Sequence, residues 1–560
     1  MAKSPNQKMT YSQSGLGPIL AVGVLVSLTF WVPHIDSFNT SKFVVLGIGA
    51  LALTIAALVK ASSKNPWNVG TYLLLGFMAL LAVNLFTSPN LYKSLIGAQG
   101  RNNGVLTYFF FAVIAYLVSQ RFTSGELPKL LWVLTGLGLI QTFYNVIQLA
   151  KLDPIKWNNP YGFILGTLGN SDFAAALLAI CAVATMWLVA LNQKSKAIAF
   201  GLAFLVLAEL VVMLKSNVRQ SLVLFLFGLS VIAYWEFSKR SKGFSLVWVG
   251  LVFLGGVTAV LGAFQIGPLT KYVFKESITF RGDYWRAAWR MFTDNPIFGV
   301  GLGNYGDYFN RYRDGIQVAR RGPAVGSDVA HSMPLDFLAM GGISLGIAYI
   351  ALISLSVLLV LRKIKQSSGD EKRIGFIIFS LLGSYLLQSF ISIDQIGLAV
   401  WGWIFIGVAF SFVESDKKVR PKDIRLNQGF ISVGLMVSLV TFVFVSIPTW
   451  RADSALKVLA TIPQQQQGVD TRSIRLDQAA KLIAMTPRDS QIKTEVALYL
   501  LSNGQAEGID YAKQALEQNP SDSTALKYLI IAYGQLKDDV NVAKYKAEAL
   551  KLDPFNPDLR

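Results

Sequence analysis

Thirteen apolar stretches recur through the first 450 of the chain's 560 residues. A bilayer core of about 30 Å requires roughly 17 to 25 residues of helix, and these stretches have that length. The chain is 53% hydrophobic and only 15% charged. The sequence therefore predicts an all-α, polytopic helical membrane protein with about 12–13 spans, near 16–34, 42–60, 70–86, 104–119, 129–150, 170–191, 197–214, 217–236, 244–264, 335–361, 374–394, 396–413 and 429–448.

The charges of the connections predict the orientation, because short loops rich in Lys and Arg stay in the cytoplasm. With residues 1–15 as a cytoplasmic N-terminus, the connections on that side hold 21 Lys+Arg and 7 Asp+Glu. The clearest is 362–373, with five basic residues. The long loop 265–334 and residues 449–560 are then extracytoplasmic. We expect a multi-pass protein of the cytoplasmic (inner) membrane whose domain 16–448 carries the chemistry.

The formal net charge of +18 lies in residues 1–448, because 449–560 hold 14 basic and 14 acidic residues. Cytoplasmic connections account for 21 − 7 = +14 of it. Since no soluble domain gathers the basic residues, we expect no nucleic-acid partner. Cytoplasmic connections use 15 Lys and 6 Arg, whereas extracytoplasmic segments use 7 Lys and 9 Arg. Arginine binds phosphate through a planar fork, so this surplus indicates a phosphate-bearing lipid ligand.

The segment 449–560 repeats itself with a period of 34 residues. Residues 511–520 align with 545–554, and Tyr499 and Tyr533 are also 34 apart. Alanines inside each unit and a proline after its second helix resemble the tetratricopeptide repeat. About two and a half units leave an apolar face uncovered. We expect a soluble, extracytoplasmic, tetratricopeptide-like domain that packs on the long loop, on itself or on a protein partner.

The long loop 265–334 contains residues that repeat with helical spacing. Arg281, Trp285, Ala288 and Phe292 predict an amphipathic helix that ends near 295–296. The following Gly299-x-Gly301-x-Gly303 lacks a preceding strand and predicts a turn rather than a nucleotide cradle. Ser332 followed by Pro334 predicts the start of the next span.

The loop arginines have two interpretations. They bind a phosphate, or they pair with the acids of the same loop, which are Asp283, Asp294, Asp307, Asp314 and Asp328. The chain has two histidines, His34 and His331, so a multi-histidine metal site is excluded and we expect no metal or other cofactor. His331 lies in the loop and is a candidate general base, since an ordinary histidine titrates near pH 6.5. The other interpretation of His331 is a hydrogen-bonding residue at a helix mouth.

Several motifs together resemble the superfamily of O-antigen ligases and O-antigen polymerases. They are Arg281-x3-Trp285, the run 295–305 that reads NPIFGVGLGNY, and His331-Ser-x2-Leu-x6-Gly341-Gly342-Ile-x-Leu-Gly346. Smaller signals are Gly97-x3-Arg101-x2-Gly104 and the run 166–176, GTLGNSDFAAA. The resemblance covers residues 15–448. It implies a metal-independent, inverting glycosyltransferase that takes a glycan from a polyprenyl (undecaprenyl) diphosphate donor and joins it to an acceptor, as in lipopolysaccharide synthesis.

The resemblance also implies site residues. His331 matches the family's histidine and Arg281 an essential loop arginine, so these two are the expected catalytic residues. Arg219 matches the arginine of a Ser-Arg motif, although here two residues separate it from Ser216. We expect Arg219, Arg101 and Arg286 to bind the diphosphate.

Other activities remain open. The acceptor is a glycolipid, a polysaccharide or a protein, so the chain is a ligase, a polysaccharide polymerase or a protein O-oligosaccharyltransferase. From another class, a transporter of lipid-linked substrates shows related halves and midplane charges, which this sequence lacks. A membrane-anchored scaffold needs only one span and no arginine-rich loop.

Overall fold

The computed structural model describes residues 15–59, 67–157, 159, 164–413, 421–465 and 470–560, and all regular elements within these ranges are helices. Among the described residues, ten helices are long and apolar enough to cross a membrane, and three shorter apolar helices accompany them. The predicted all-α, polytopic fold is thereby confirmed. The helices that correspond to the thirteen stretches are α1 (Gly17–Leu28), α2 (Asn39–Val59), α3 (Val69–Thr87), α5 (Val105–Arg121), α6 (Leu127–Leu149), α7 (Ser171–Leu191), α8 (Lys196–Lys215), α9 (Arg219–Ser238), α10 (Lys242–Ala263), α15 (Met333–Gln366), α16 (Gly369–Ile391), α17 (Ile396–Ser411) and α18 (Pro421–Thr441).

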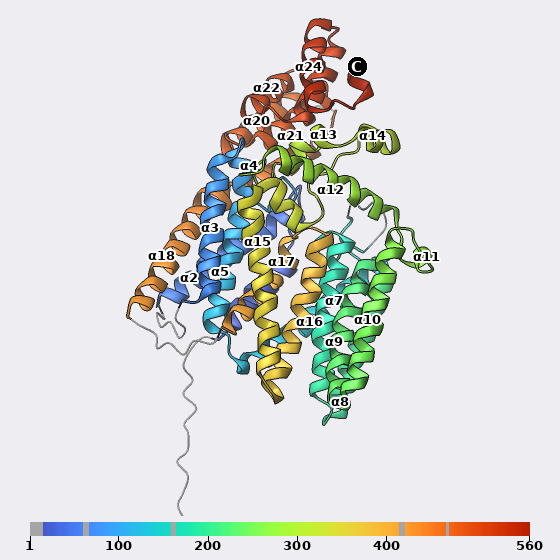
Figure 1. Cartoon of the computed structure of the whole chain (residues 1–560). Helices are drawn as coiled ribbons and strands as arrows, with labels where there is room; N and C mark the ends of the chain where they lie inside the picture. Colours follow the sequence, from blue (N-terminus) through green and yellow to red (C-terminus); the bar gives the residue numbers. More distant parts are fainter. Residues whose placement is uncertain (1–14, 60–66, 158, 160–163, 414–420, 466–469) are drawn as a thin grey trace, which may run out of the picture.

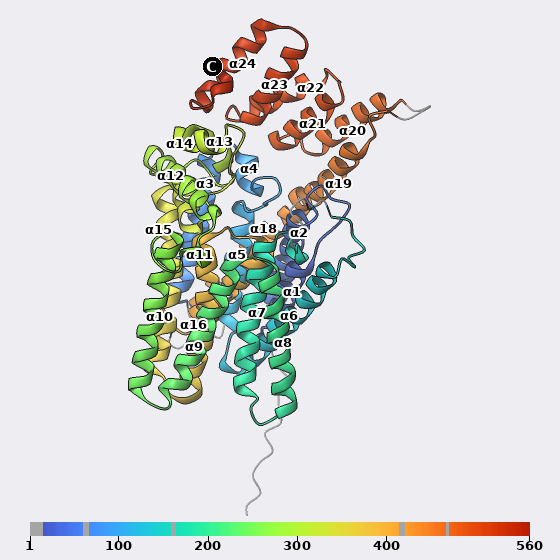
Figure 2. The same ribbon diagram turned by 90° about the vertical axis from the view of Figure 1, so that its right-hand side faces the viewer.

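The bundle has two dissimilar ends (Figure 1). The long loop and the C-terminal helices lie together at one end, which we call the loop end. The connection between α15 and α16, which includes the basic run 362–373, lies at the other. The loop end also carries the helices α4 (Leu91–Ile96), α11 (Thr270–Val273), α12 (Glu276–Asp294), α13 (Tyr305–Tyr312) and α14 (Gly315–Arg321). Figure 2 shows the same separation from the side.

A buried lysine fixes the end of the first helix. The Lys42 side chain is fully buried, and its Nζ donates to the carbonyl oxygens of Thr29 at 2.5 Å, Thr167 at 2.7 Å and Ser27 at 3.3 Å. The last carbonyls of a helix have no partner within the helix. Lys42 satisfies carbonyl oxygens at the end of α1 and links them to the segment before α7.

The last span continues into the C-terminal region without a break. A π-helical turn, Phe442–Ser446, joins α18 to α19 (Ile447–Thr461), so the predicted domain boundary at 448 falls inside one continuous helical rod. The far half of α19 contributes to a separate hydrophobic core, to which Leu456 and Leu459 bring fully or nearly fully buried side chains. The rod is therefore both a membrane span and the first helix of the C-terminal domain.

Five further α-helices and a 3-10 turn, Pro557–Leu559, follow α19 in the described part of the chain (Figure 2). Asp489 and Asp522, 33 residues apart, cap α21 and α23 by accepting hydrogen bonds from the second and third following amides. The aligned runs 511–520 and 545–554 fall on the second helix of each pair and the residues after it. The bounds are α20 (Thr471–Met485), α21 (Ser490–Ser502), α22 (Gly508–Gln518), α23 (Ser523–Gln535) and α24 (Asp539–Leu552).

The helix α15 is broken at Gly342, and the glycine-rich loop fills the break. Gly342 has φ 63° and ψ −166°, a conformation that is essentially restricted to glycine. The amide of Ile343 donates to the Pro296 carbonyl at 2.7 Å. The amides of Val300 and Gly301 donate to the carbonyls of α15 residues 339 and 340, at 3.0 and 2.9 Å. The two glycine motifs of the sequence thus pair with each other, and the predicted turn at 299–303 is confirmed, with positive φ at all three glycines.

Asn84 of α3 fastens this junction. Its Nδ2 donates to the carbonyl of Phe298 at 2.9 Å and to that of Met340 at 3.0 Å, and its Oδ1 accepts from the Leu302 amide at 3.0 Å. The side chain is 2% exposed. One buried amide therefore joins three elements, and it satisfies backbone groups that a broken spanning helix leaves without partners.

We expect Gly342→Ala to destabilise the protein. A Cβ at this position overlaps the carbonyl of Ile297, and alanine does not tolerate the positive φ, so the loss is about 2 kcal/mol or more. Gly256→Ala in α10 is the matched control, since a Cβ there meets no atom within 4 Å. Thermal unfolding in detergent checks this. Equal melting temperatures for the two variants contradict the role of Gly342.

Candidate active site

The amphipathic helix α12 lies across the loop end (Figure 1) and places its buried face on the start of α15. It spans Glu276–Asp294, so the predicted helix is confirmed, as is the predicted helix start at Ser332. Tyr284 of α12 stacks on the ring of His331, with centroids 5.3 Å apart and planes 26° from parallel. Arg321 donates to the Tyr284 hydroxyl at 3.0 Å and stacks on Phe280 at 3.6 Å. These contacts fix one face of the imidazole.

His331 has an unusual backbone and an unusual proton affinity. Its φ is 57°, in the left-handed region, and its side chain is partly buried. Burial lowers its pKa to about 4, and the positive charges of Arg281 and Arg101 act in the same direction, whereas Asp328 opposes them. The imidazole is therefore neutral at pH 7 and has a free lone pair for a proton. Two loop arginines that are distant in sequence lie close enough to influence it.

Arg101 reaches this site as half of an ion pair. Its Nε lies 2.6 Å from Asp328 Oδ2, and its Nη2 lies 3.3 Å from Oδ1. Partial desolvation disfavours the charged carboxylate, but Arg101 outweighs it and holds the pKa of Asp328 below its usual value. Asp328 stands three residues before His331. The structure therefore brings Arg101 to His331, with its charge already compensated by a carboxylate.

Arg281, Arg219 and Lys275 form a second basic group, which we call the basic rim. Arg281 Nε donates to the Ile391 carbonyl at 2.8 Å, and Arg219 Nη1 donates to the Phe274 carbonyl at 2.6 Å. Within the described parts of the chain, neither arginine lies within ion-pair distance of a carboxylate. All three side chains are partly exposed.

The effects of neighbouring charges on pKa indicate that the members of the basic rim lie close together. Arg219 lowers the pKa of Lys275, although burial of the ammonium has the larger effect. Burial also lowers the pKa of Arg281, and the nearby carboxylate of Asp172 partly offsets this. Asp172 lies in the first turn of α7 and raises the pKa of both Arg281 and Lys275. Three cations with one acid nearby attract a polyanion.

Arg286 and Arg320 pair with acids of the same loop, as the second interpretation expected. Asp283, 2% exposed, accepts from Arg286 at 2.5 Å and from Arg320 through both oxygens at 2.6 Å. Arg286 also donates to Asp314 at 3.0 Å. The predicted diphosphate-binding residue Arg286 therefore lies half-exposed between two carboxylates, on the helix that carries Arg281.

Two buried carboxylates, Asp336 and Asp394, belong to the same region, and the sequence assigned neither of them a role in the site. Asp336 accepts a hydrogen bond from the Ala330 amide at 2.7 Å and so fixes the backbone immediately before the histidine. Asp394, between α16 and α17, accepts from the Tyr385 hydroxyl at 2.9 Å. Asp336 stands at the end of an apolar stretch, which indicates a polar site there, whereas no local spacing connects Asp394 to His331.

Comparison with known proteins points to the same region. Residues 203–350 match the sequence model of the family described as O-antigen ligase. The match begins in α8, covers the whole long loop and ends in α15, so it includes Arg219, Arg281 and His331 but not Arg101. No curated protein matches the chain. Over this segment, which contains most of the candidate site, the chain is similar to O-antigen ligase.

Proposed function

We propose that the protein is a membrane glycosyltransferase that transfers a glycan from a polyprenyl diphosphate donor to an acceptor at the outer face of the cytoplasmic membrane. The observation that carries the proposal is the basic rim, which is partly exposed and whose arginines form no ion pair among the described residues, together with a nearby histidine that is neutral at pH 7. The similarity of residues 203–350 to O-antigen ligase supports the same chemistry.

The distribution of charge supports the outer face. The basic run 362–373 lies at the end of the bundle opposite the site (Figure 1). Basic connections are retained in the cytoplasm, so the loop end faces outward and the C-terminal domain lies on the same side as the site.

The mechanism follows from the two basic groups. Arg281 and Arg219 bind the donor diphosphate through charge-assisted hydrogen bonds, each contributing about 1.5 to 3 kcal/mol. His331 accepts the proton of the acceptor hydroxyl, whose oxygen attacks the anomeric carbon. The bond from that carbon to the diphosphate oxygen breaks, and the diphosphate leaves with its electron pair. The arginines stabilise it more strongly as its charge grows, which lowers the barrier.

Binding of the donor also tunes the base. Arg281 lowers the pKa of His331 in the free protein. A diphosphate on Arg281 compensates that charge, so the histidine becomes a stronger base once the donor is bound. Asp328 stabilises the imidazolium, because its carboxylate raises the pKa of His331, whereas the charge of Arg101 lowers it. In this proposal Arg101 acts through Asp328, and Arg286 does not contact the donor.

The C-terminal domain favours a large acceptor. It resembles tetratricopeptide repeats and lies at the loop end with the site. A polysaccharide or a protein is therefore favoured over a small glycolipid. Incubation of the purified protein with donor alone distinguishes the two, since a polymerase makes products of increasing length and a protein glycosyltransferase requires a polypeptide.

We expect His331→Asn to lower the rate of transfer by roughly 10²- to 10⁴-fold, because asparagine tolerates the positive φ but does not accept the proton. Donor consumption by the purified protein in detergent measures this. A transfer rate within threefold of the wild type excludes His331 as the base.

We expect Arg281→Ala and Arg219→Ala each to lower kcat/KM for the donor by roughly 10- to 100-fold, the value of one charge-assisted contact. Arg290→Ala is the matched control on the same helix, since Arg290 is exposed and donates to the Tyr312 carbonyl. If the control falls as far as Arg281→Ala, the assignment of the diphosphate site is wrong.

The neutral His331 also predicts a pH dependence of stability. Its pKa is about 4 in the folded protein and near 6.5 when unfolded, so between these values the unfolded chain binds more protons. This contribution to the free energy of unfolding is present above pH 6.5 and is lost as the pH falls toward 4. We expect His331→Asn to lose on the order of 1 kcal/mol less stability than the wild type between pH 7 and pH 5. Parallel melting curves for both proteins contradict the neutral histidine.

A further inference from the structure

The C-terminal domain contacts both of the segments that carry Arg101 and Asp328, the ion pair beside His331. The first contact is made by Arg313, which lies at the end of α13 and has a fully buried side chain. Its guanidinium donates to the Asp553 carboxylate at 2.7, 2.8 and 3.1 Å, and Asp553 directly follows α24. Arg313 and Asp553 are 240 residues apart in sequence.

The same guanidinium binds the segment that leads to the site. Arg313 Nη2 donates to the Pro323 carbonyl, and Nη1 donates to the Val325 carbonyl, both at 3.0 Å. Val325 stands three residues before Asp328 and six before His331. The path from the C-terminal domain to this half of the ion pair therefore consists of a buried bidentate ion pair and a short stretch of backbone.

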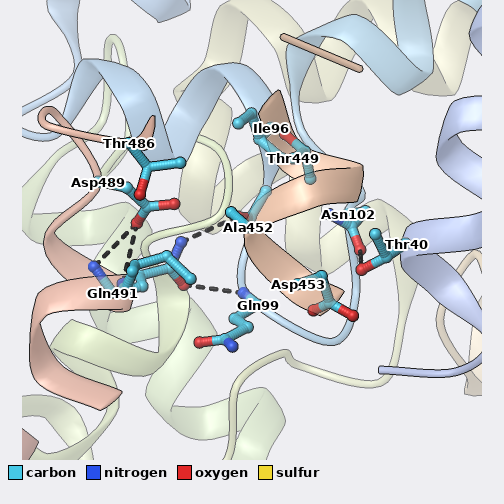
Figure 3. Close-up of a pocket in the computed structure, with 12 residues that line it drawn as sticks. Thr40, Ile96, Gln99, Asn102, Thr449, Ala452, Asp453, Thr486, Asp489 and Gln491 are labelled. Carbon is cyan, nitrogen blue, oxygen red and sulfur yellow. Dashed lines mark hydrogen bonds between the residues drawn. The ribbon is translucent and has the colours of Figure 1, made fainter. Parts of the chain in front are cut away.

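The second contact is made by Gln491, in the first turn of α21. Its Oε1 accepts from the Gln99 amide at 2.8 Å, and its Nε2 donates to the Gly97 carbonyl at 3.3 Å. Figure 3 shows Gln491 and Gln99 joined in this way at a pocket lined by residues of both the C-terminal domain and the spanning domain. Residues 97–104 form the loop that carries Arg101. A single amide side chain thus pairs with that backbone at two points.

A third contact lies between the first two. Asp307 of α13 accepts from Lys93 of α4 at 2.7 Å and from Asn519 of the C-terminal domain at 2.9 Å. The domain also has hydrophobic cores largely of its own, so these polar contacts are not required to bury its apolar faces. Directional contacts of this kind specify one relative position of the parts they join.

We propose that the C-terminal domain is a positioning element of the active site, in which Asp553 and Gln491 are the positioning residues that set the Arg101–Asp328 pair beside His331. The importance of that pair for catalysis rests on the proposed function. Asp553 acts through Arg313 and the segment 323–328. Gln491 acts through the loop 97–104.

Hydrogen exchange on the purified full-length protein in detergent tests whether the C-terminal domain fixes these two segments. It requires no substrate. One variant combines Arg313→Met with Asp553→Leu, which removes both charges and leaves neither buried alone. A second is Gln491→Ala, which removes only neutral contacts. The control is Glu507→Ala, which breaks an exposed ion pair with Arg472 inside the same domain.

We expect exchange in 322–330 to become at least tenfold faster in the double variant, and exchange in 97–104 at least tenfold faster in Gln491→Ala. The control leaves both segments unchanged. Unchanged exchange in these segments, in variants whose α20–α24 remain protected, overturns the proposal. Because no turnover is measured, this result stands whether or not the protein transfers glycans.

Turnover tests the catalytic part. We expect kcat for glycan transfer to fall at least fivefold in both variants, with the donor KM within twofold of wild type, because the basic rim lies on other elements. A raised KM with unchanged kcat overturns the positioning role. If the wild type consumes no lipid-linked donor, the proposed function fails, and the exchange experiment still decides whether the domain fixes these segments.

Discussion

The break of α15 at Gly342 is the constraint on which the site depends. A spanning helix that breaks leaves amides and carbonyls without partners, and lipid cannot satisfy them. Here the backbone of 296–301 takes that place, and Asn84 completes the pairing from a third helix. The long loop is therefore anchored to the bundle at a single fixed register. Helix α12 precedes this anchor and the first turn of α15 follows the loop, so Tyr284 and His331 meet.

The distribution of carboxylates then decides which arginines remain available to a ligand. Asp283, Asp328 and Asp553 each accept from at least one arginine, and these ion pairs connect the parts of the loop end to one another. Arg281 and Arg219 instead bind backbone carbonyls, which carry no net charge. The paired arginines thus hold the parts of the loop end together, whereas Arg281 and Arg219 pair with no carboxylate among the described residues and lie at partly exposed positions.

The sequence predicted what local pattern encodes. Apolar stretches gave the spans, helical spacing gave α12, and glycine spacing gave the turn at 299–303. It did not predict that Arg313 pairs with Asp553, since these residues lie 240 positions apart and no periodicity links them. Asn84 was missed for the same reason, because one asparagine in an apolar helix resembles many others. The continuous rod α18–α19 was missed because polar residues after 448 suggested the end of a span, although they lie on the same helix.

The cost of burying charge indicates that the ion pair between the long loop and the C-terminal domain serves orientation rather than stability. Removing a guanidinium and a carboxylate from water costs several kcal/mol per ion, and a well-packed apolar pair would do as well for stability alone. Apolar contacts, however, tolerate sliding, whereas a bidentate ion pair with two further carbonyl contacts fixes one orientation. The Arg313–Asp553 pair fixes the orientation of the backbone at 323–325, which only a few residues separate from Asp328 and His331. The position of the C-terminal domain is therefore coupled to the segment that carries Asp328 and His331.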